Sequence, residues 1–200
     1  MPDAIGRPPD VIGDFLRDYG EHRLADGSPA KLAVYFPAVD DLRELRPHVD
    51  LAVVAAGHDP SIVTECTNAS GPDERDAFHR FRFPDSPHRI ALLVNMGTEG
   101  WDCPNLFATA LARTLRTSNN FVLRAASRCL RQVPGNDRPA RIYLSATNRS
   151  ALDRQLSETY GEALAQLDHR ARASKPNVVR LRKTDLPPLR LRLSIRRVDQ

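Results

Sequence analysis

Two apolar runs without alternation constrain the fold more than any other feature of this sequence. Lys31–Phe36 and Arg89–Asn95 are compact apolar segments, and the second is the clearest candidate for a buried strand. A strand that is apolar on both faces has to be covered on both faces, which is typical of parallel sheets. Leu51–Ala56 has the same character, so it predicts a further strand of this kind.

Candidate helices alternate with these runs and with two later apolar segments. The later strand candidates are Leu106–Ala112 and Ala140–Ser145. The helical candidates lie near Val11–Tyr19, Pro37–Leu45 with a stop at Pro47, Asp73–Phe83 after a loop in residues 58–72, Phe121–Arg131 and Ser150–Ala173. This alternation predicts an α/β fold, with an open and mainly parallel sheet and helices on both faces. Ligands of such sheets bind at the carboxyl ends of the strands, so the loop after Asn95 is expected to hold the site.

Size and composition limit the class of protein. A chain of 200 residues, 41% hydrophobic and 27% charged, can bury one large core or two small ones. It has no apolar run near the roughly 18–20 residues that span a bilayer. Its three cysteines form no CxxC pair, and its six histidines show no metal-ligand spacing. We therefore expect a cytoplasmic protein without a membrane segment, a disulfide framework or a metal site.

Positive charge is concentrated at the C-terminal end. The formal net charge is +4, but residues 170–200 hold ten Lys/Arg and two Asp, a local +8. Within them, Leu189–Arg197 alternates apolar and basic residues in the pattern of a half-buried strand. The alternatives are phosphate contacts made by Arg190, Arg192 and Arg196, the first strand of a following domain, or a solvated surface. The domain organisation we expect is an irregular segment 1–29, a lobe 30–174 and a basic extension 175–200.

Two glycines and two carboxylates follow the strand candidate that ends at Asn95. The loop reads GTEGWD over residues 97–102. Glycine lets a backbone approach a phosphate or ribose closely, and a carboxylate there can accept a hydrogen bond from a ribose hydroxyl. The glycine spacing is not that of the GxGxxG dinucleotide fingerprint. The structural alternative is a tight turn in which Asp102 is a cap and Trp101 fills the core.

Arginines at helical spacing form a second candidate site. Arg124, Arg128 and Arg131 stand at i, i+4 and i+7 of a predicted helix, so they would share one face. Like charges on one face repel, and a phosphate opposite them would offset that cost because guanidinium groups match its oxygens. The alternative is a solvated face. Ala125 and Ala126 favour the anion-binding interpretation because they leave room around the arginines.

Two segments taken together resemble a known family. Residues 89–105, RIALLVNMGTEGWDCPN, resemble motif V of superfamily 2 helicases, in the EGWD form of type III restriction enzyme Res subunits and related DEAD/DEAH-box proteins. Residues 123–131, LRAASRCLR, resemble motif VI, usually written QxxGRxxR, with Arg124 and Ser127 where Gln and Gly are usual. The resemblance covers about residues 30–146 and implies the second, C-terminal RecA-like lobe of such a motor.

The resemblance also implies roles for individual residues. Asp102 would approach the ATP ribose or hold the contact between lobes. Gly100 and Thr98 would line the nucleic-acid path or link it to the nucleotide site, with Gly100 as the cofactor-binding residue and Thr98 as the nucleic-acid-binding one. Arg128 and Arg131 would be arginine fingers that reach the ATP phosphates.

Two further helicase motifs are absent from the sequence. The 200 residues contain neither a GxxxxGK[ST] phosphate loop nor a DExx box after a strand. We therefore expect the C-terminal motor lobe of an ATP-dependent DNA helicase or translocase, inactive alone. A separate N-terminal lobe, in cis or in trans, would hold most of the ATP and its Mg²⁺, and a modification or nuclease subunit could join the complex. The alternative is a non-catalytic nucleic-acid-binding or interaction module with a RecA-like fold.

Overall fold

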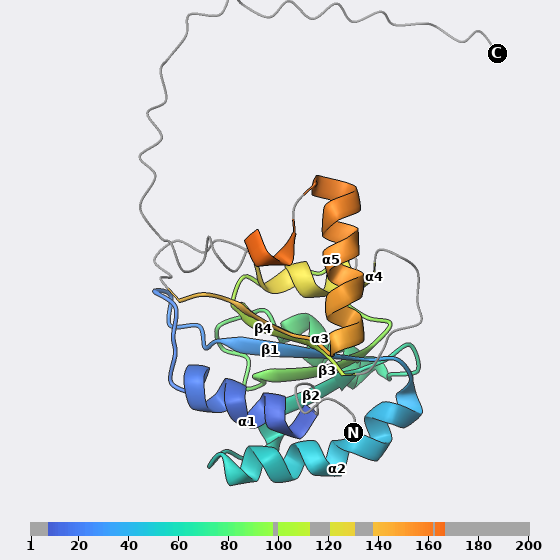
Figure 1. The fold of residues 1–200 in the computed structure, drawn as a ribbon. Helices are drawn as coiled ribbons and strands as arrows, with labels where there is room; N and C mark the ends of the chain where they lie inside the picture. The colour runs from blue at the N-terminus through green and yellow to red at the C-terminus, as the bar shows by residue number, and fades with distance from the viewer. Residues whose placement is uncertain (1–7, 98–99, 113–120, 131–137, 162, 167–200) are drawn as a thin grey trace, which may run out of the picture.

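The sheet has five strands, and helices cover both of its faces (Figure 1). The computed structural model describes residues 8–97, 100–112, 121–130, 138–161 and 163–166. The strands are β1 (Lys31–Phe36), β2 (Val63–Cys66), β3 (Ile90–Val94), β4 (Leu106–Leu111) and β5 (Arg141–Tyr143). They pair in the order β2-β3-β1-β4-β5, and every pairing is parallel. The predicted α/β fold with an open parallel sheet is therefore confirmed.

Alternate side chains of the strands belong to two separate cores. The helices are α1 (Pro8–Tyr19), α2 (Val39–Ala55), η1 (Pro60–Ile62), α3 (Pro72–Arg80), α4 (Phe121–Ala126), η2 (Ser127–Cys129) and α5 (Ala146–Tyr160). On β1, Leu32, Val34 and Phe36 pack with α1 and α2. Ala33 and Tyr35 pack on the other face, with α3, α4 and α5. Figure 1 shows α1 and α2 below the sheet and α4 and α5 above it. Among the described helices, none is long and apolar enough to cross a membrane.

One predicted strand is part of a helix. The prediction at Leu51–Ala56 is wrong, because α2 does not stop at Pro47 and runs on through this segment. Pro47 lies on the exposed side of α2. Leu42, Val49 and Val53 form the buried stripe of the helix. Packing of this stripe against the sheet outweighs the strand propensity of the valines.

One strand lies where the sequence predicts a loop, and one helix has different ends. β2 occupies four residues of the segment 58–72. Its Glu65 is partly exposed and forms an ion pair with Arg46 of α2, so the strand lacks the apolar signature of its neighbours. α5 begins earlier than predicted, because the Ser145 side chain caps it. It ends at Gly161, whose φ of 66° suits a left-handed C-cap.

A buried lysine fixes the end of α3 to the amino edge of the sheet. Lys31 is the first residue of β1 and is fully buried. Its Nζ donates to the carbonyl oxygens of Phe81 and Phe83, just beyond α3, and lies 4.6 Å from the Phe81 ring centroid. The last carbonyls of a helix lack partners within the helix and attract positive charge. Burial nevertheless lowers the pKa of Lys31 to about 8.

A buried arginine does the same for α1. Arg89 directly precedes β3, and its Nη1 donates to Gly20 O at 2.6 Å. Its Nη2 donates to Tyr19 O at 3.1 Å and to Ala30 O at 3.2 Å. The neighbouring strands β1 and β3 thus each begin beside a cation that caps a helix, and the two helices lie on opposite faces of the sheet.

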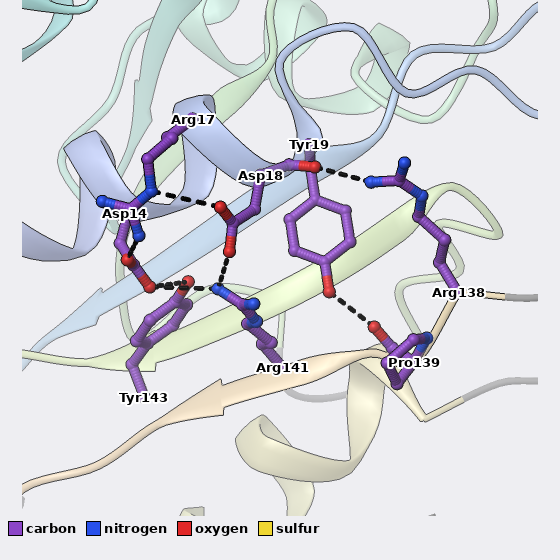
Figure 2. A network of polar contacts seen from close by, with 8 residues as sticks. All are labelled: Asp14, Arg17, Asp18, Tyr19, Arg138, Pro139, Arg141 and Tyr143. Atoms are coloured by element: carbon purple, nitrogen blue, oxygen red, sulfur yellow. Dashed lines mark hydrogen bonds and ion pairs between the residues drawn. The ribbon is translucent and has the colours of Figure 1, made fainter.

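A polar network fastens α1 to the edge strand β5 (Figure 2). Arg141 of β5 forms ion pairs with Asp14 and Asp18 of α1, and Tyr143 Oη lies 3.1 Å from Asp14 Oδ2. Burial acts to raise the pKa of Asp18, but hydrogen bonds and charge from Arg141 and Arg17 lower it below its ordinary value. Two hydrogen bonds to backbone carbonyls complete the network. Tyr19 Oη donates to Pro139 O, and Arg138 Nη1 donates to Asp18 O.

Lys31→Met should make the stability of the chain respond differently to pH. Below the folded pKa of about 8 the lysine is protonated in both states; between there and 10.5 the unfolded chain binds the extra proton. Wild-type stability relative to Lys31→Met should therefore rise with pH in this window, by up to about 1.4 kcal/mol per pH unit. Urea unfolding at several pH values measures this difference. The exposed control Arg154→Met should show a pH-independent difference, and the same result for Lys31→Met would contradict the assignment.

Arg141→Met should loosen the junction of α1 and β5. The two ion pairs are partly exposed, so the free energy of unfolding should fall by about 0.5–1.5 kcal/mol at neutral pH. The lowered pKa of Asp18 means that its contribution is lost as pH falls below the ordinary value of 3.8. The difference between variant and wild type should therefore shrink in acid, as measured by urea unfolding. Arg43→Met, which removes an exposed pair with Asp40, is the control. An equal loss at both pH values would argue against the ionic role.

Candidate functional site

The loop from β3 to β4 begins at the carboxyl edge of the sheet and carries the first predicted site. Three of its residues are left-handed: Asn95 (φ 55°), Gly97 (φ 72°) and Gly100 (φ 64°). A Cβ on Gly97 would lie 3.0 Å from Trp101 Cε3 and 3.1 Å from Leu93 Cδ1, so both φ and space require glycine there. Gly100 has open space around it, and only its φ favours glycine.

Trp101 anchors this loop in the core. Its ring lies 5.0 Å from that of Phe78 and 6.1 Å from that of Phe81, between centroids, and it is 8% exposed. Tyr35 Oη, from β1, donates to Gly97 O at 3.3 Å. Burial raises the pKa of Tyr35, so the phenol keeps the proton that it donates. The core-filling interpretation of Trp101 is correct, and the same loop leaves Asp102 exposed beside it.

Arg128 joins the second motif to this loop. Its Nη1 donates to Trp101 O at 2.6 Å. The turn η2 that carries Arg128 is held against β4, because Thr109 Oγ1 donates to Ala126 O at 3.3 Å and lies 3.5 Å from Cys129 Sγ. Burial raises the pKa of Cys129 to about 11, so its thiol is neutral and serves packing. The chain therefore places a guanidinium, partly buried, next to the exposed Asp102.

The predicted helix at Phe121–Arg131 is too long. α4 ends at Ala126 and the chain tightens into the 3₁₀ turn η2, which carries Cys129 into the core beside β4. Arg124 is exposed on α4, whereas Arg128 extends from η2 to the β3–β4 loop. Arg124 and Arg128 therefore do not share a single α-helix as predicted, and Arg131 lies outside the described residues.

The described part of the chain contains three of the predicted site residues. Gly100, Asp102 and Arg128 lie in two neighbouring segments, joined by the bond between Arg128 and the Trp101 carbonyl. The other predicted site residues lie outside the described residues: Thr98, Arg131, Arg190, Arg192 and Arg196. Within the described ranges, no group of three or more His, Cys, Asp and Glu could hold a metal ion. At this edge the described residues offer one partly buried guanidinium, of Arg128, and one exposed carboxylate, of Asp102.

Sequence reasoning missed the contacts that position these groups. Tyr35 was hidden in an apolar run, where a tyrosine hydroxyl that needs a partner is the only signal. The bond from Arg128 ends on a main-chain oxygen, and no residue type at position 101 encodes it.

No family model matches the sequence, and a search of curated proteins finds no match. Solved structures do match. "Mss116p DEAD-box helicase domain 2 bound to an RNA duplex" aligns with a TM-score of 0.50 and 13% identity, over 78% of this chain and 56% of that one. S. cerevisiae Dbp5 bound to RNA and ADP BeF3 aligns with a TM-score of 0.50 and 15% identity, over 78% of this chain and 38% of that one.

These identities are low, and the likeness therefore concerns the fold. The chain spans between about a third and three fifths of the length of these structures, 38% and 56%. It has the RecA-like α/β fold seen in the second domain of DEAD-box helicases.

Gly97→Ala should be more destabilising than other glycine substitutions in this chain. The new methyl group would meet the Trp101 and Leu93 side chains on a backbone with φ of 72°, at a cost of about 2 kcal/mol or more. Gly27→Ala isolates the backbone term, because φ is 81° in open space, and should cost about 1 kcal/mol. Gly13→Ala, inside α1, should stabilise by about 1 kcal/mol. Urea unfolding followed by circular dichroism ranks the three, and equal losses at positions 97 and 27 would contradict the packing argument.

Proposed function

We propose that this chain is the C-terminal motor lobe of an ATP-dependent DNA helicase or translocase of the type III restriction Res kind. It contributes motif V and motif VI to an ATPase site that a separate N-terminal lobe completes. The observation that carries the proposal is the hydrogen bond from Arg128 to the Trp101 carbonyl, since it connects the two segments that resemble these motifs.

Arg128 would act on the phosphates of ATP held by the other lobe. Transfer of the γ-phosphoryl group to water spreads negative charge over its oxygens, and an arginine that stabilises this charge accelerates hydrolysis strongly. Arg131 would be a second finger. Asp102 would accept a hydrogen bond from the ribose or from the facing lobe, and Gly100 allows the backbone to approach the nucleotide. Mg²⁺ would be bound by carboxylates of the other lobe.

Coupling to nucleic acid would run through the β3–β4 loop. The main-chain oxygen of Trp101 in this loop accepts a hydrogen bond from Arg128, and Thr98 would contact the nucleic acid. Closure of the two lobes on ATP would therefore act on both the nucleotide site and the nucleic-acid path. The neighbouring structures named above contain RNA, whereas the resemblance to Res subunits favours DNA. A modification or nuclease subunit is a further partner that the Res resemblance suggests.

A second candidate function rests on charge alone. The local +8 of residues 170–200 favours a non-catalytic nucleic-acid-binding module. Salt-dependent binding to DNA and RNA duplexes separates the two candidates. Strong binding that is lost on deleting residues 175–200, with no ATPase activity in any complex, would favour the module.

The test of the motor proposal is ATP hydrolysis with and without a partner lobe. The open reading frames that flank the gene are translated, and one that encodes GxxxxGK[ST] followed by DExx is co-expressed with this chain. We expect no hydrolysis by the chain alone and DNA-stimulated hydrolysis by the complex. Arg128→Ala should lower kcat by about 10³-fold or more. Arg128→Lys should recover only part of the loss, because an ammonium lacks the guanidinium fork.

Arg149→Ala is the matched control, because Arg149 is exposed on α5. Its rate should equal that of the wild type. If the isolated chain hydrolysed ATP and neither Arg128→Ala nor Arg131→Ala reduced the rate, the motor proposal and the assigned roles of both arginines would be contradicted.

A further inference from the structure

A buried threonine of β4 lies at the junction of α4 and η2. Thr109 is the only polar residue of β4 and is fully buried. Its register partner on β1 is Ala33, so it projects from the same face of the sheet as Tyr35, whose hydroxyl holds the β3–β4 loop. A hydroxyl in such surroundings costs free energy unless it is hydrogen-bonded. The Thr109 hydroxyl donates to Ala126 O, at the last residue of α4, over 3.3 Å.

The hydrogen-bond pattern of the main chain changes at the residue that this hydroxyl contacts. In a continuing α-helix the N–H of Leu130 would donate to Ala126 O, four residues earlier. It donates instead to Ser127 O at 3.1 Å, three residues earlier, which is the 3₁₀ pattern of η2. The Thr109 hydroxyl thus donates to Ala126 O in place of the donor that a longer α4 would supply.

The Cys129 thiol completes this arrangement, and it can donate only one hydrogen bond. Its Sγ lies 3.4 Å from Ala126 O and 3.4 Å from Arg141 O of β5. Because the Thr109 hydroxyl already donates to Ala126 O, the thiol hydrogen is available to Arg141 O. The two side chains then join η2 to the neighbouring strands β4 and β5. Arg128 directly precedes Cys129, so its main chain is held by the same attachment.

We propose that the Thr109 hydroxyl positions Arg128 by ending α4 at Ala126. Its hydrogen bond favours the 3₁₀ turn η2 over a further α-helical turn, and η2 directs the guanidinium to Trp101 O. Successive side chains are about 100° apart around an α-helix and about 120° apart around a 3₁₀-helix, so a longer α4 would point residue 128 in a different direction. The inference rests on the proposed function for its effect on ATP hydrolysis, whereas its effect on Arg128 can be measured in the chain alone.

Magnetic resonance of the full-length chain tests the proposal. A long-range HNCO spectrum detects coupling across hydrogen bonds, and so shows which carbonyl carbon accepts from a given amide. In the wild type the amide of Leu130 should couple to the carbonyl of Ser127. In Thr109→Val, which removes the hydroxyl and keeps the branched shape, it should couple to the carbonyl of Ala126 instead, because that oxygen needs a donor.

A second signal reports on the guanidinium. The amide nitrogen of Asp102 belongs to the same peptide group as the Trp101 carbonyl, so loss of the hydrogen bond from Arg128 changes its chemical shift. Arg128→Met gives the position of this signal without the bond. In Thr109→Val the signal should move from its wild-type position toward the position in Arg128→Met, because the guanidinium no longer reaches Trp101 O.

Two variants separate the hydroxyl from general packing. Thr109→Ser keeps the hydroxyl and should match the wild type in both signals. Thr64→Val, at another buried threonine, on β2, is the matched control and should leave both unchanged. If Thr109→Val does not fold, Thr109→Ala removes the same hydroxyl with a smaller side chain. Wild-type coupling of Leu130 without the Thr109 hydroxyl, or the same changes in Thr109→Ser, would overturn the proposal.

Hydrolysis by the complex with a partner lobe separates this inference from the proposed function. Thr109→Val should lower kcat by about 10²-fold, since a small displacement of a catalytic group is enough for such a loss. KM for ATP should stay near its wild-type value, because the other lobe would bind most of the nucleotide, and Thr109→Ser should restore kcat. The expected changes in a chain that no partner lobe makes into an ATPase would support this inference and contradict the motor proposal. An active complex whose Thr109→Val variant keeps the wild-type coupling of Leu130 would overturn this inference alone.

Discussion

Two buried cations, Lys31 and Arg89, satisfy the carbonyl oxygens that end α3 and α1 at the amino edge of the sheet. In an all-parallel sheet the crossover helices run against the strands, so their C-terminal carbonyls collect at this edge. Without a donor, these carbonyls would be buried at a cost of about 1–3 kcal/mol each. Because the helices end at the amino edge, their N-termini lie toward the carboxyl edge of the sheet. The positive ends of the helix dipoles therefore favour anions at the carboxyl edge.

The fold could be predicted from the sequence where a strand is buried on both faces. β1, β3 and β4 are fully buried, so both faces of each strand have to be mostly apolar. This composition can be recognised in the sequence without knowing which elements pack against the strand. Leu51–Ala56 has a similar composition but lies in α2, because packing of one helical stripe decides its structure. β2 was missed for the opposite reason: it is an edge strand that contains the polar residues Thr64 and Glu65, so its sequence lacks the apolar signature of a buried strand. In both cases the deciding interaction is with residues distant in sequence.

The members of the candidate site come from the resemblance to helicase motifs, and their roles stay predictions. The structure places Gly100, Asp102 and Arg128 in adjoining segments, which the bond from Arg128 to the Trp101 carbonyl joins. The contacts that hold them were not predictable, because Tyr35 and Arg128 both donate to main-chain oxygens of the β3–β4 loop. The predicted helix was also too long, since α4 ends at Ala126 and Arg128 lies on the 3₁₀ turn η2.

The position of Trp101 makes the chain its own optical probe. Trp101 is the only tryptophan in 200 residues. Its ring packs on Phe78 of α3, and its carbonyl accepts from Arg128. Light emitted by a single indole in this place depends on whether the β3–β4 loop stays packed and on where the guanidinium lies. Rearrangement of either segment, by a ligand or by a partner lobe, would therefore be visible as intrinsic fluorescence without any attached dye.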